Sequence, residues 1–383
     1  MGKSGDILIV YLGSSGGGVL DTFEIAESLS KHGGNRYSVL ISANNPFKEQ
    51  FERLPLGRIF VEETHTAKTS DFVLKTLMRS RIRRIARSIR ASGAGLILFT
   101  MEHAWMWPLI SRLKQSPRRP LLCYIRHNPS GFVNGRSDVR DRLLSFVERR
   151  IIRNVDCIFT LSEHVRRATI KEFGTREDKV INIGLGSHTS LCKHWKHHGF
   201  AEGGRVRLLF FGRILPYKGV EVLVKAFIRM REQRLPVELT VAGEGKIGEA
   251  LLVGGQRAGV RYVNRWLDDS ELCCLLSDTD VVVLPYNEAS QSGPAGIAAG
   301  LGIPIIASNV GGLAEQVVDG ENGILVQPGS ADAICRAVKT FVDRPELLRE
   351  YSNRTKRLSD KQFSWREKGN RLDAIFSELI NAA

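Results

Sequence analysis

The first half of the chain alternates short apolar runs with helical stretches. The apolar runs are strand-sized and nearly continuous, and they cover residues 6–12, 37–41, 96–100, 121–125, 156–160 and 180–183. Apolar strands separated by helices are typical of a parallel sheet that helices cover on both faces. The pattern therefore predicts a doubly wound α/β domain.

The second half repeats this pattern after a break. Residues 185–202 are rich in histidine, glycine and lysine, and strand-like runs resume at residues 206–211, 237–241, 280–284, 304–307 and 324–326. We place the domain boundary near residue 195, so that residues 1–195 and 196–365 each form a Rossmann-like domain. Such sheets bind ligands beyond the carboxyl ends of their strands, so two facing domains would place the active site in the cleft between them.

The length of the chain agrees with two domains. Its 383 residues exceed what a single core usually holds. No apolar run approaches the roughly 18 residues that a membrane span requires, and residues 7–12 resemble a first strand more than a signal peptide. The six cysteines include no Cys-x-x-Cys pair, which favours scattered buried thiols in a reducing cytoplasm.

The whole excess of positive charge lies in the first half. Residues 1–197 hold 32 lysines and arginines against 18 acidic residues, whereas residues 198–383 hold 23 of each. A basic domain indicates an anionic partner, which can be a nucleic acid, a phospholipid surface or a phosphate-bearing substrate. Residues 75–90 carry seven of these cations and no acid, with helical spacing of their apolar positions. This helix either docks on an anionic membrane or packs on the core with a solvated basic face.

The strongest chemical motif follows the strand at residues 206–211. Gly212 and Arg213 come first, Lys218 follows after a short loop, and a helical pattern begins at residue 220. Two cations at the carboxyl end of a strand, beside the N-terminus of a helix, form a favourable site for a diphosphate. Two solvated surface cations are the alternative interpretation.

This order of strand, Gly-Arg, loop and Lys-Gly resembles the second domain of the retaining GT-B glycosyltransferases of the family-four type. Arg213 and Lys218 stand at the positions of that motif, and the resemblance continues through residues 241–245, 266–276, 280–286, 300–307 and 311–315. It implies a GT-B fold and a nucleotide-diphosphate sugar as the donor. It also implies transfer to a hydroxyl with retention of anomeric configuration. Arg213 and Lys218 would stabilise the charge that grows on the leaving diphosphate.

The loop between residues 286 and 300 departs from the commoner family pattern. Many members have two glutamates here with seven residues between them, and Ala295 stands at the position of the second. Residues 290–294 read Ser-Gln-Ser-Gly-Pro and resemble a variant branch of the family. They suit an anion because a serine can cap a helix and a glycine lets backbone N–H groups approach a phosphate. An ordinary capped helix without a ligand is the alternative. The predicted donor-binding residues here are Glu288, Gln291, Ser292 and Gly293, together with Gly212.

The first domain carries fewer motifs. The glycine-rich residues 13–18 lack the Gly-x-Gly-x-x-Gly spacing of a dinucleotide site. In the family this loop lies under the donor, so we assign Gly17 to donor binding and Gly16 to the acceptor side, with tight-turn glycines as the alternative. By the same resemblance His127 faces the donor sugar and takes part in catalysis, unless it is a structural histidine. His103 is a second candidate, on the acceptor side.

Two patterns look like metal sites but have simpler interpretations. Asp278 and Asp280 form an Asp-x-Asp pair directly before a buried strand, which favours capping and solvation. The histidines at 188, 194, 197 and 198 have irregular spacing, which favours a flexible interdomain linker. No metal and no other cofactor is predicted, because two cations and a helix N-terminus supply the positive field. By the resemblance, residues 366–383 form a helix that crosses back to the first domain.

The sequence therefore predicts a retaining glycosyltransferase that moves a sugar from a nucleotide-diphosphate sugar to a lipid-linked or glycan acceptor, as in polysaccharide or glycoconjugate synthesis. We expect it in the cytoplasm, peripheral on the inner membrane face. One alternative is a sugar-nucleotide epimerase-type enzyme on the same fold. The other is a nucleic-acid-binding protein, but the basic half has no aromatic stacking platform or recognition-helix motif, so nucleic acid is not an expected partner.

Overall fold

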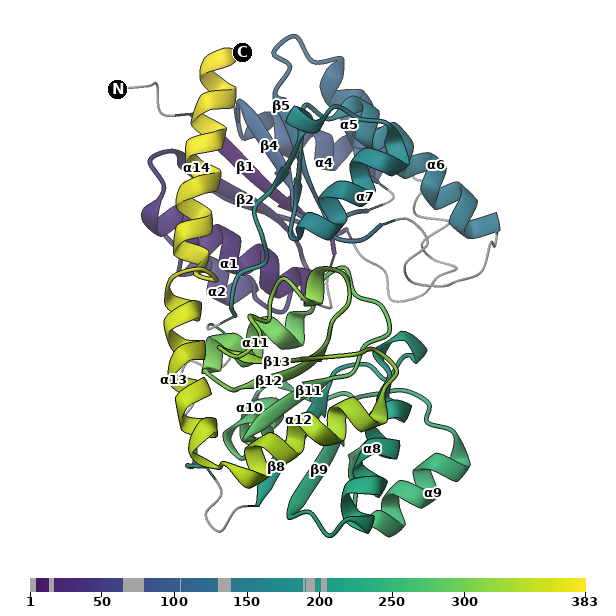
Figure 1. The fold of residues 1–383 in the computed structure, drawn as a ribbon. Helices are drawn as coiled ribbons and strands as arrows, with labels where there is room; N and C mark the ends of the chain where they lie inside the picture. The colour runs from purple at the N-terminus through teal and green to yellow at the C-terminus, as the bar shows by residue number, and fades with distance from the viewer. Residues whose placement is uncertain are drawn as a thin grey trace. The chain divides into compact units, whose positions relative to one another are not determined.

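A computed structural model describes residues 5–13, 17–64, 79–103, 105–129, 139–188, 190, 197–200 and 205–383. The chain forms two compact units (Figure 1). The first consists of Met1–Gly184 and Trp365–Ala383, and the second of Leu185–Ser364. Each unit is built on a parallel sheet with helices packed against it.

The first unit has seven parallel strands among the described residues, in the order β3-β2-β1-β4-β5-β6-β7. They are β1 (Asp6–Tyr11), β2 (Arg36–Ser42), β3 (Ile59–Glu62), β4 (Leu96–Phe99), β5 (Leu121–Arg126), β6 (Cys157–Thr160) and β7 (Val180–Asn182). The helices are α1 (Gly17–His32), α2 (Lys48–Glu52), α4 (Arg79–Ala91), α5 (Met106–Lys114), α6 (Val139–Asn154) and α7 (Glu163–Phe173). The strand order reverses between β1 and β4, which is where ligands bind in open α/β sheets.

The second unit has six parallel strands in the order β10-β9-β8-β11-β12-β13 within the described part of the chain. They are β8 (Val206–Phe211), β9 (Val237–Ala242), β10 (Arg261–Val263), β11 (Val281–Leu284), β12 (Ile305–Ser308) and β13 (Gly323–Val326). Its helices are α8 (Val220–Glu232), α9 (Glu249–Ala258), α10 (Asp269–Ser277), α11 (Gly293–Leu301), α12 (Ala331–Asp343) and α13 (Glu346–Asp360), with the short 3-10 helices η3 (Pro216–Lys218) and η4 (Gly311–Leu313). Its order reverses between β8 and β11.

The central strands are buried along their whole length. In β11 every residue is buried, and in β1 every residue after Asp6 is at most 1% exposed. Burial on both faces explains why these strands are continuous apolar runs without polar alternation. The predicted fold class, two doubly wound parallel sheets, is confirmed.

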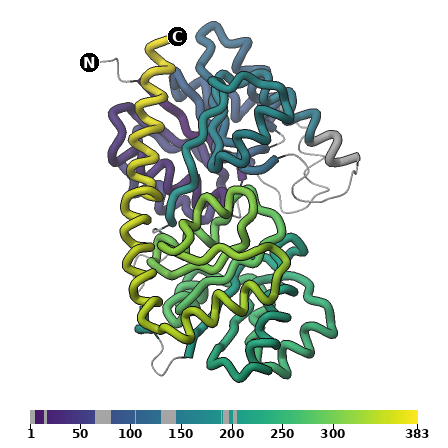
Figure 2. The backbone as a smooth tube through the Cα atoms, viewed as in Figure 1, coloured from purple at the N-terminus to yellow at the C-terminus, as the bar shows by residue number. Residues whose placement is uncertain are grey.

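The last helix, α14 (Trp365–Ala382), packs along α1 of the first unit (Figure 2). The Ser28 hydroxyl donates to the Trp365 carbonyl at 2.7 Å, and Leu372 and Phe376 are fully buried. Asp373 accepts hydrogen bonds from the backbone N–H of Gly34, the Asn35 side chain and the Tyr37 hydroxyl. These bonds hold the pKa of Asp373 below its ordinary value despite partial burial. The C-terminal helix is therefore an integral part of the first unit.

The cysteines differ from the expected set of buried thiols. Cys123 and Cys157 are buried thiols that face each other across β5 and β6, and Cys335 is a third. Cys274 is a thiol but is exposed, and Cys273 is disulfide-bonded, so the prediction is wrong for these two residues. Cys192 lies outside the described residues.

Candidate active site

The turn after β8 contains two glycines with positive φ and close neighbours. Gly212 has φ +110°, and a Cβ atom there would lie 3.0 Å from Lys218 Nζ. Gly219 has φ +64°, and a Cβ atom there would lie 1.9 Å from the Pro285 carbonyl oxygen. Both backbone conformations favour glycine. The turn that carries Arg213 and η3 is therefore clamped against the end of β11.

The two predicted cations differ in their surroundings. The Arg213 side chain is exposed, whereas Lys218 is only 9% exposed, so the alternative of two solvated surface cations does not hold for Lys218. Neither pairs with a carboxylate in the part of the chain that the structure describes. The Lys218 ammonium lies over the Tyr286 ring, 5.1 Å from its centroid. Its pKa is lowered by burial and by the positive charge of Arg213, against the opposing influence of Tyr217.

This arrangement is electrostatically incomplete without a bound anion. Burying an ammonium without an anionic partner costs free energy, and a second cation nearby increases that cost. A phosphate between Arg213 and Lys218 would reverse both effects and form charge-assisted hydrogen bonds. The pair therefore has the electrostatics of an anion site.

The start of α11 lies beside this turn. A Cβ atom on Gly212 would lie 3.7 Å from Cγ of Pro294, in the first turn of α11. The Ser292 hydroxyl accepts the N–H of Ala295 at 3.3 Å and so caps the helix. The backbone N–H of Gly293 has no acceptor among the described residues. This open N–H group at a helix N-terminus faces the same end of the sheet as the cations, where an anion binds favourably.

Ser292 is itself held from both sides, which the sequence did not predict. Its backbone N–H donates to Oε1 of Gln316 at 2.7 Å, and Nε2 of Gln316 donates to its carbonyl at 3.0 Å. The Ser292 hydroxyl also donates to the Tyr286 hydroxyl at 3.4 Å. With its polar groups engaged, Ser292 serves to order the loop, and its predicted direct contact with a phosphate stays a prediction.

The other loop residues that we predicted have contrasting environments. Ala295, at the position of the missing glutamate, is fully buried, while Glu288 is exposed and Gln291 is half-buried. A larger side chain at residue 295 has no open space. Whether Glu288 contacts a ribose stays a prediction.

We expect the Ala295→Glu variant to bind nucleotide no more tightly than the parent, because the new carboxylate would be buried in the helix and would not reach a ligand. Burying an unpaired polar group costs about 1–3 kcal/mol of unfolding free energy. Ser292→Ala should lose about 1 kcal/mol through the missing cap and should weaken nucleotide binding. Thermal unfolding with and without UDP measures both effects. Tighter binding by Ala295→Glu would contradict this interpretation of the loop.

In the first unit, His127 has a hydrogen bond at one ring nitrogen and a carboxylate near the other. Its Nε2 atom lies 2.7 Å from the Thr100 carbonyl, which can only accept, so Nε2 carries the proton. Its Nδ1 atom lies 3.7 Å from a carboxylate oxygen of Asp21, and the ring is 2% exposed. This geometry fits a histidine that orders the ends of β4 and β5. The predicted contact with a donor sugar stays a prediction.

The remaining predicted residues of the first unit lie near the ends of other elements. Nδ1 of His103 accepts the N–H of Trp105 at 3.1 Å, and its ring packs edge-on against the Trp105 ring just before α5. Gly17 is exposed and is the first residue of α1. Gly16 lies outside the described residues.

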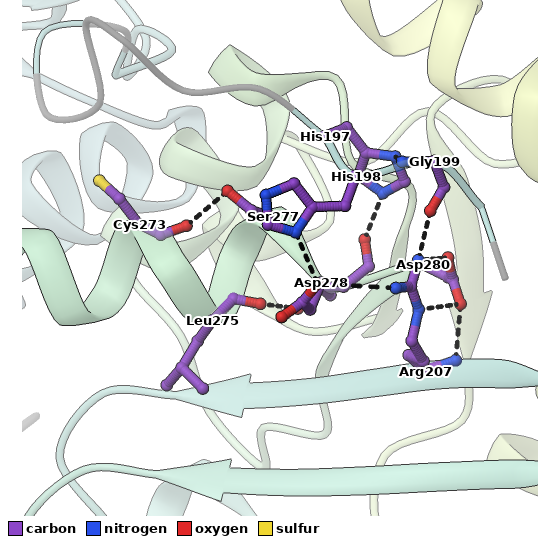
Figure 3. Close-up of polar contacts among 10 residues, drawn as sticks. His197, His198, Gly199, Arg207, Cys273, Leu275, Ser277, Asp278 and Asp280 are labelled. Atoms are coloured by element: carbon purple, nitrogen blue, oxygen red, sulfur yellow. Dashed lines mark hydrogen bonds and ion pairs between the residues drawn. The ribbon is translucent and has the colours of Figure 1, made fainter.

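The Asp-x-Asp pair takes part in ion pairs of the second unit (Figure 3). Asp280 is fully buried and accepts from Arg207 through Nη2 at 2.7 Å, Nε at 3.0 Å and the backbone N–H at 2.8 Å. Asp278 is exposed and accepts from Nδ1 of His198 at 2.8 Å. The expectation of solvation is therefore wrong for Asp280, whose carboxylate is neutralised by an arginine of β8.

The described histidines of the expected linker are anchored in the second unit, and Figure 3 shows two of them, His197 and His198. Nε2 of His197 donates to the Thr279 carbonyl at 2.9 Å, and His188 is buried against Gly296 of α11. The flexible linker that we expected is thus wrong at these positions, while His194 lies outside the described residues. No group of three or more metal-ligating side chains occurs among the residues that the structure describes.

Sequence comparison relates both units to glycosyltransferases. Residues 15–190 match the family described as Glycosyltransferase Family 4, and residues 205–344 match the family described as Glycosyl transferases group 1. A glycogen synthase of Mycobacterium tuberculosis is 29% identical over 62% of this chain. A mannosyltransferase of Mycolicibacterium hassiacum, the MMP alpha-(1->4)-mannosyltransferase, is 28% identical, also over 62%. The matches span 56% and 58% of those proteins, little more than half of their length.

Solved structures share the fold along the whole chain. Sucrose-phosphate synthase from Thermosynechococcus elongatus has a TM-score of 0.74 at 19% identity, covering 99% of this chain and 100% of that one. The Anabaena protein HepE, in complex with UDP and glucose, has a TM-score of 0.70 at 17% identity, covering 97% and 99%. The two parallel-sheet units define a GT-B fold. The two family matches, one over each unit, make the chain similar to the GT-B glycosyltransferases of the family-four type in sequence as well as in fold.

Proposed function

We propose that this glycosyltransferase takes its sugar from a nucleotide-diphosphate donor and binds the diphosphate at Arg213, Lys218 and the start of α11. The observation that carries the proposal is the buried Lys218 ammonium, which has an exposed arginine beside it and no carboxylate partner among the described residues. Structural neighbours support it, since HepE is described with UDP-glucose and starch synthase IV with ADP and acarbose.

In the proposed reaction the two cations stabilise the charge that develops on the departing diphosphate. A preorganised cation contributes more there than in water, because water is partly excluded and no reorganisation is needed as the charge grows. The open N–H of Gly293 adds a third donor with the helix dipole behind it. We assign no covalent nucleophile. We propose retention of anomeric configuration, which the anomeric coupling constant of the product in proton NMR tests.

The test of this function uses binding and turnover together. A panel of UDP, ADP, GDP and their sugar conjugates is screened by thermal shift, since a ligand at 100 times its Kd adds about 2.7 kcal/mol of stability. Release of nucleotide from the best donor is then followed with and without hydroxyl acceptors. Acceptor-dependent release supports sugar transfer. Conversion of the donor sugar without nucleotide release would instead identify an epimerase-type enzyme.

The absence of a metal requirement is part of the proposal. Two cations and a helix N-terminus can neutralise a diphosphate without a divalent ion. Turnover after exhaustive dialysis against EDTA should therefore equal that of the untreated enzyme. Loss of turnover that magnesium or manganese restores would contradict this part of the proposal.

We propose that the first unit contributes His103 and Gly16 to the acceptor side, Gly17 to donor binding and His127 to catalysis beside the donor sugar. We also propose that it docks on an anionic membrane that carries a lipid-linked acceptor. The apolar stripe of α4 is buried in the core, with Ile82, Ile85 and Ile89 at most 4% exposed. Its opposite face presents Arg83 and Arg87, which are exposed and have no acidic partner among the described residues. No helix in the described ranges has the length and apolarity to cross a membrane.

A second feature of this surface supports docking. Helix α5 packs against both α4 and α6, so the three helices are neighbours in the first unit. On α6, Phe146 is 54% exposed, and the exposed Arg150 guanidinium lies 5.0 Å from its ring centroid. An exposed aromatic ring beside an arginine suits a membrane interface, where the ring meets the acyl boundary and basic side chains meet acidic headgroups.

We expect the double variant Arg83→Glu/Arg87→Glu to bind acidic vesicles about 30-fold more weakly than the parent, because each basic side chain near an anionic surface contributes about 1 kcal/mol. Sedimentation with phosphatidylcholine vesicles, with and without phosphatidylglycerol, measures this. The matched control is Arg231→Glu/Arg257→Glu, which makes the same charge change at exposed sites of the second unit. Equal loss in both variants, or no binding by the parent at low salt, would remove the membrane proposal and leave the transferase proposal intact.

A further inference from the structure

Lys218 is held by an aromatic ring where a carboxylate would be the usual partner of a buried lysine. Its ammonium lies 5.1 Å from the centroid of Tyr286, and the Tyr286 side chain is itself 2% exposed. The face of an aromatic ring attracts a cation through its quadrupole without carrying a net charge. A carboxylate at this place would fix the lysine equally well but would cancel the charge that a diphosphate needs.

Tyr286 is fixed relative to Lys218 by the backbone around it. The carbonyl of Pro285 abuts Gly219, and the N–H of Asn287 donates to the carbonyl of Tyr217 at 2.7 Å. Pro285 and Asn287, which flank Tyr286, thus contact Gly219 and Tyr217, which flank Lys218. The Tyr217 ring meets the Tyr286 ring edge-on, with centroids 6.2 Å apart.

Tyr286 also connects Lys218 to the start of α11. Its hydroxyl accepts from Ser292, which Gln316 clamps through both backbone groups. One chain of contacts therefore runs from Gln316 through Ser292 and Tyr286 to the ammonium. This chain sets the cation and the open N–H group of Gly293 at fixed places at the same end of the sheet.

We propose that Tyr286 is the positioning residue of the diphosphate site, whose ring holds the Lys218 ammonium in place while leaving its full charge to the ligand. This inference rests on the proposed role of Lys218 in binding the diphosphate. It adds that the end of β11 prepares the cation before the ligand arrives, so that little side-chain ordering is left to occur on binding.

The charged and titratable groups around Lys218 determine how the ring affects its proton. Arg213 and Tyr217 face it from its own turn, Tyr286 faces it from the end of β11, and the uncharged Gly212 lies against it directly after β8. Of these groups, the ring is the one that stabilises the ammonium without a net charge. Removing it lowers the Lys218 pKa, so affinity for a diphosphate is lost at a lower pH as the solution is made alkaline.

The test compares Tyr286→Leu, which removes the ring, with Tyr286→Phe, which keeps it and removes only the hydroxyl. Calorimetric titration uses whichever of UDP, ADP and GDP stabilises the parent most, at a series of pH values. We expect Tyr286→Leu to bind about 10- to 30-fold more weakly. In a plot of affinity against pH, the fall at high pH (the alkaline limb) should move to lower pH. Tyr286→Phe should remain within about threefold of the parent with an unchanged limb, because the ring face is preserved.

The matched control is Tyr351→Leu. Tyr351 is also a buried tyrosine of the second unit with an arginine over its ring, and it should lose stability without moving the alkaline limb. A Tyr286→Leu variant that binds like Tyr286→Phe, with the same limb, would overturn the inference. A Lys218→Met variant that binds like the parent would overturn the proposed function instead.

If Tyr286→Leu does not fold, proton NMR of the parent protein tests whether the Tyr286 ring covers the Lys218 side chain. The ring current of Tyr286 should move the ε-methylene proton signals of Lys218 upfield, and Lys218→Met identifies those signals by their absence. Tyr286→Phe should keep the upfield position. Lys218 signals at the position of an ordinary solvated lysine in the parent would overturn the inference.

Discussion

Lys218→Met should lower kcat/KM for sugar transfer by roughly 30- to 1,000-fold, which corresponds to about 2–4 kcal/mol of transition-state stabilisation. The variant replaces lysine with an unbranched side chain that is one atom shorter and uncharged, so most of the space under Tyr286 stays filled. Arg213→Ala should have an effect of similar size without a packing change, because Arg213 is exposed. Initial rates at varied donor concentration measure both variants.

The control for this prediction is Arg231→Ala, an exposed arginine of α8 in the same unit as the site. It should leave kcat/KM unchanged. If Lys218→Met or Arg213→Ala kept near-normal kcat/KM, the assignment of the diphosphate site would be lost. If Lys218→Met melts at or below the assay temperature, the assay is repeated at a temperature below its melting temperature.

Arg207→Met should lower the free energy of unfolding by about 3–5 kcal/mol, the usual cost of leaving a buried charge without its partner. The Asp280 carboxylate has no exposed surface, and Arg207 supplies three of its hydrogen bonds. One of these comes from the backbone and survives the substitution. Chemical denaturation followed by circular dichroism measures the loss.

Arg205→Met is the matched comparison, because Arg205 lies two residues away and forms an exposed pair with Glu238. Exposed pairs contribute about 1 kcal/mol or less, so this variant should be close to the parent. The double variant Arg207→Met/Asp280→Leu should recover much of the stability that Arg207→Met loses, since it removes both charges together. Equal losses in the two single variants would contradict the structural role of Asp280.

The sequence predicted the central strands well and missed the first sheet's β3 and the second sheet's β10. Both are short edge strands with partly exposed side chains, so neither forms a continuous apolar run. A central parallel strand is covered on both faces and is visible in the sequence as an apolar run, whereas an edge strand is identified by the neighbour that it pairs with.

The same distinction applies to the candidate site. Arg213 and Lys218 lie in one local motif, so their spacing in the chain was sufficient to predict that they act together. Tyr286 and Gln316 contact this site from elements far along the chain. Residues 280–286 and 311–315 beside them supported the family resemblance, but did not indicate that these two side chains reach Lys218 and Ser292. The burial of Lys218 was missed for the same reason, because the ring that covers it comes from the end of β11.

The contacts of α14 have a consequence for the order in which the protein is completed during synthesis. The sheet of the first unit leaves the ribosome early, but part of its core, including Leu372 and Phe376, is near the C-terminus of this chain. The second unit lies between these segments and is continuous in sequence, so it can fold as soon as it emerges. The unit that is made first is therefore the one that is finished last, and until then the face of α1 that α14 covers is open to aggregation or to a chaperone.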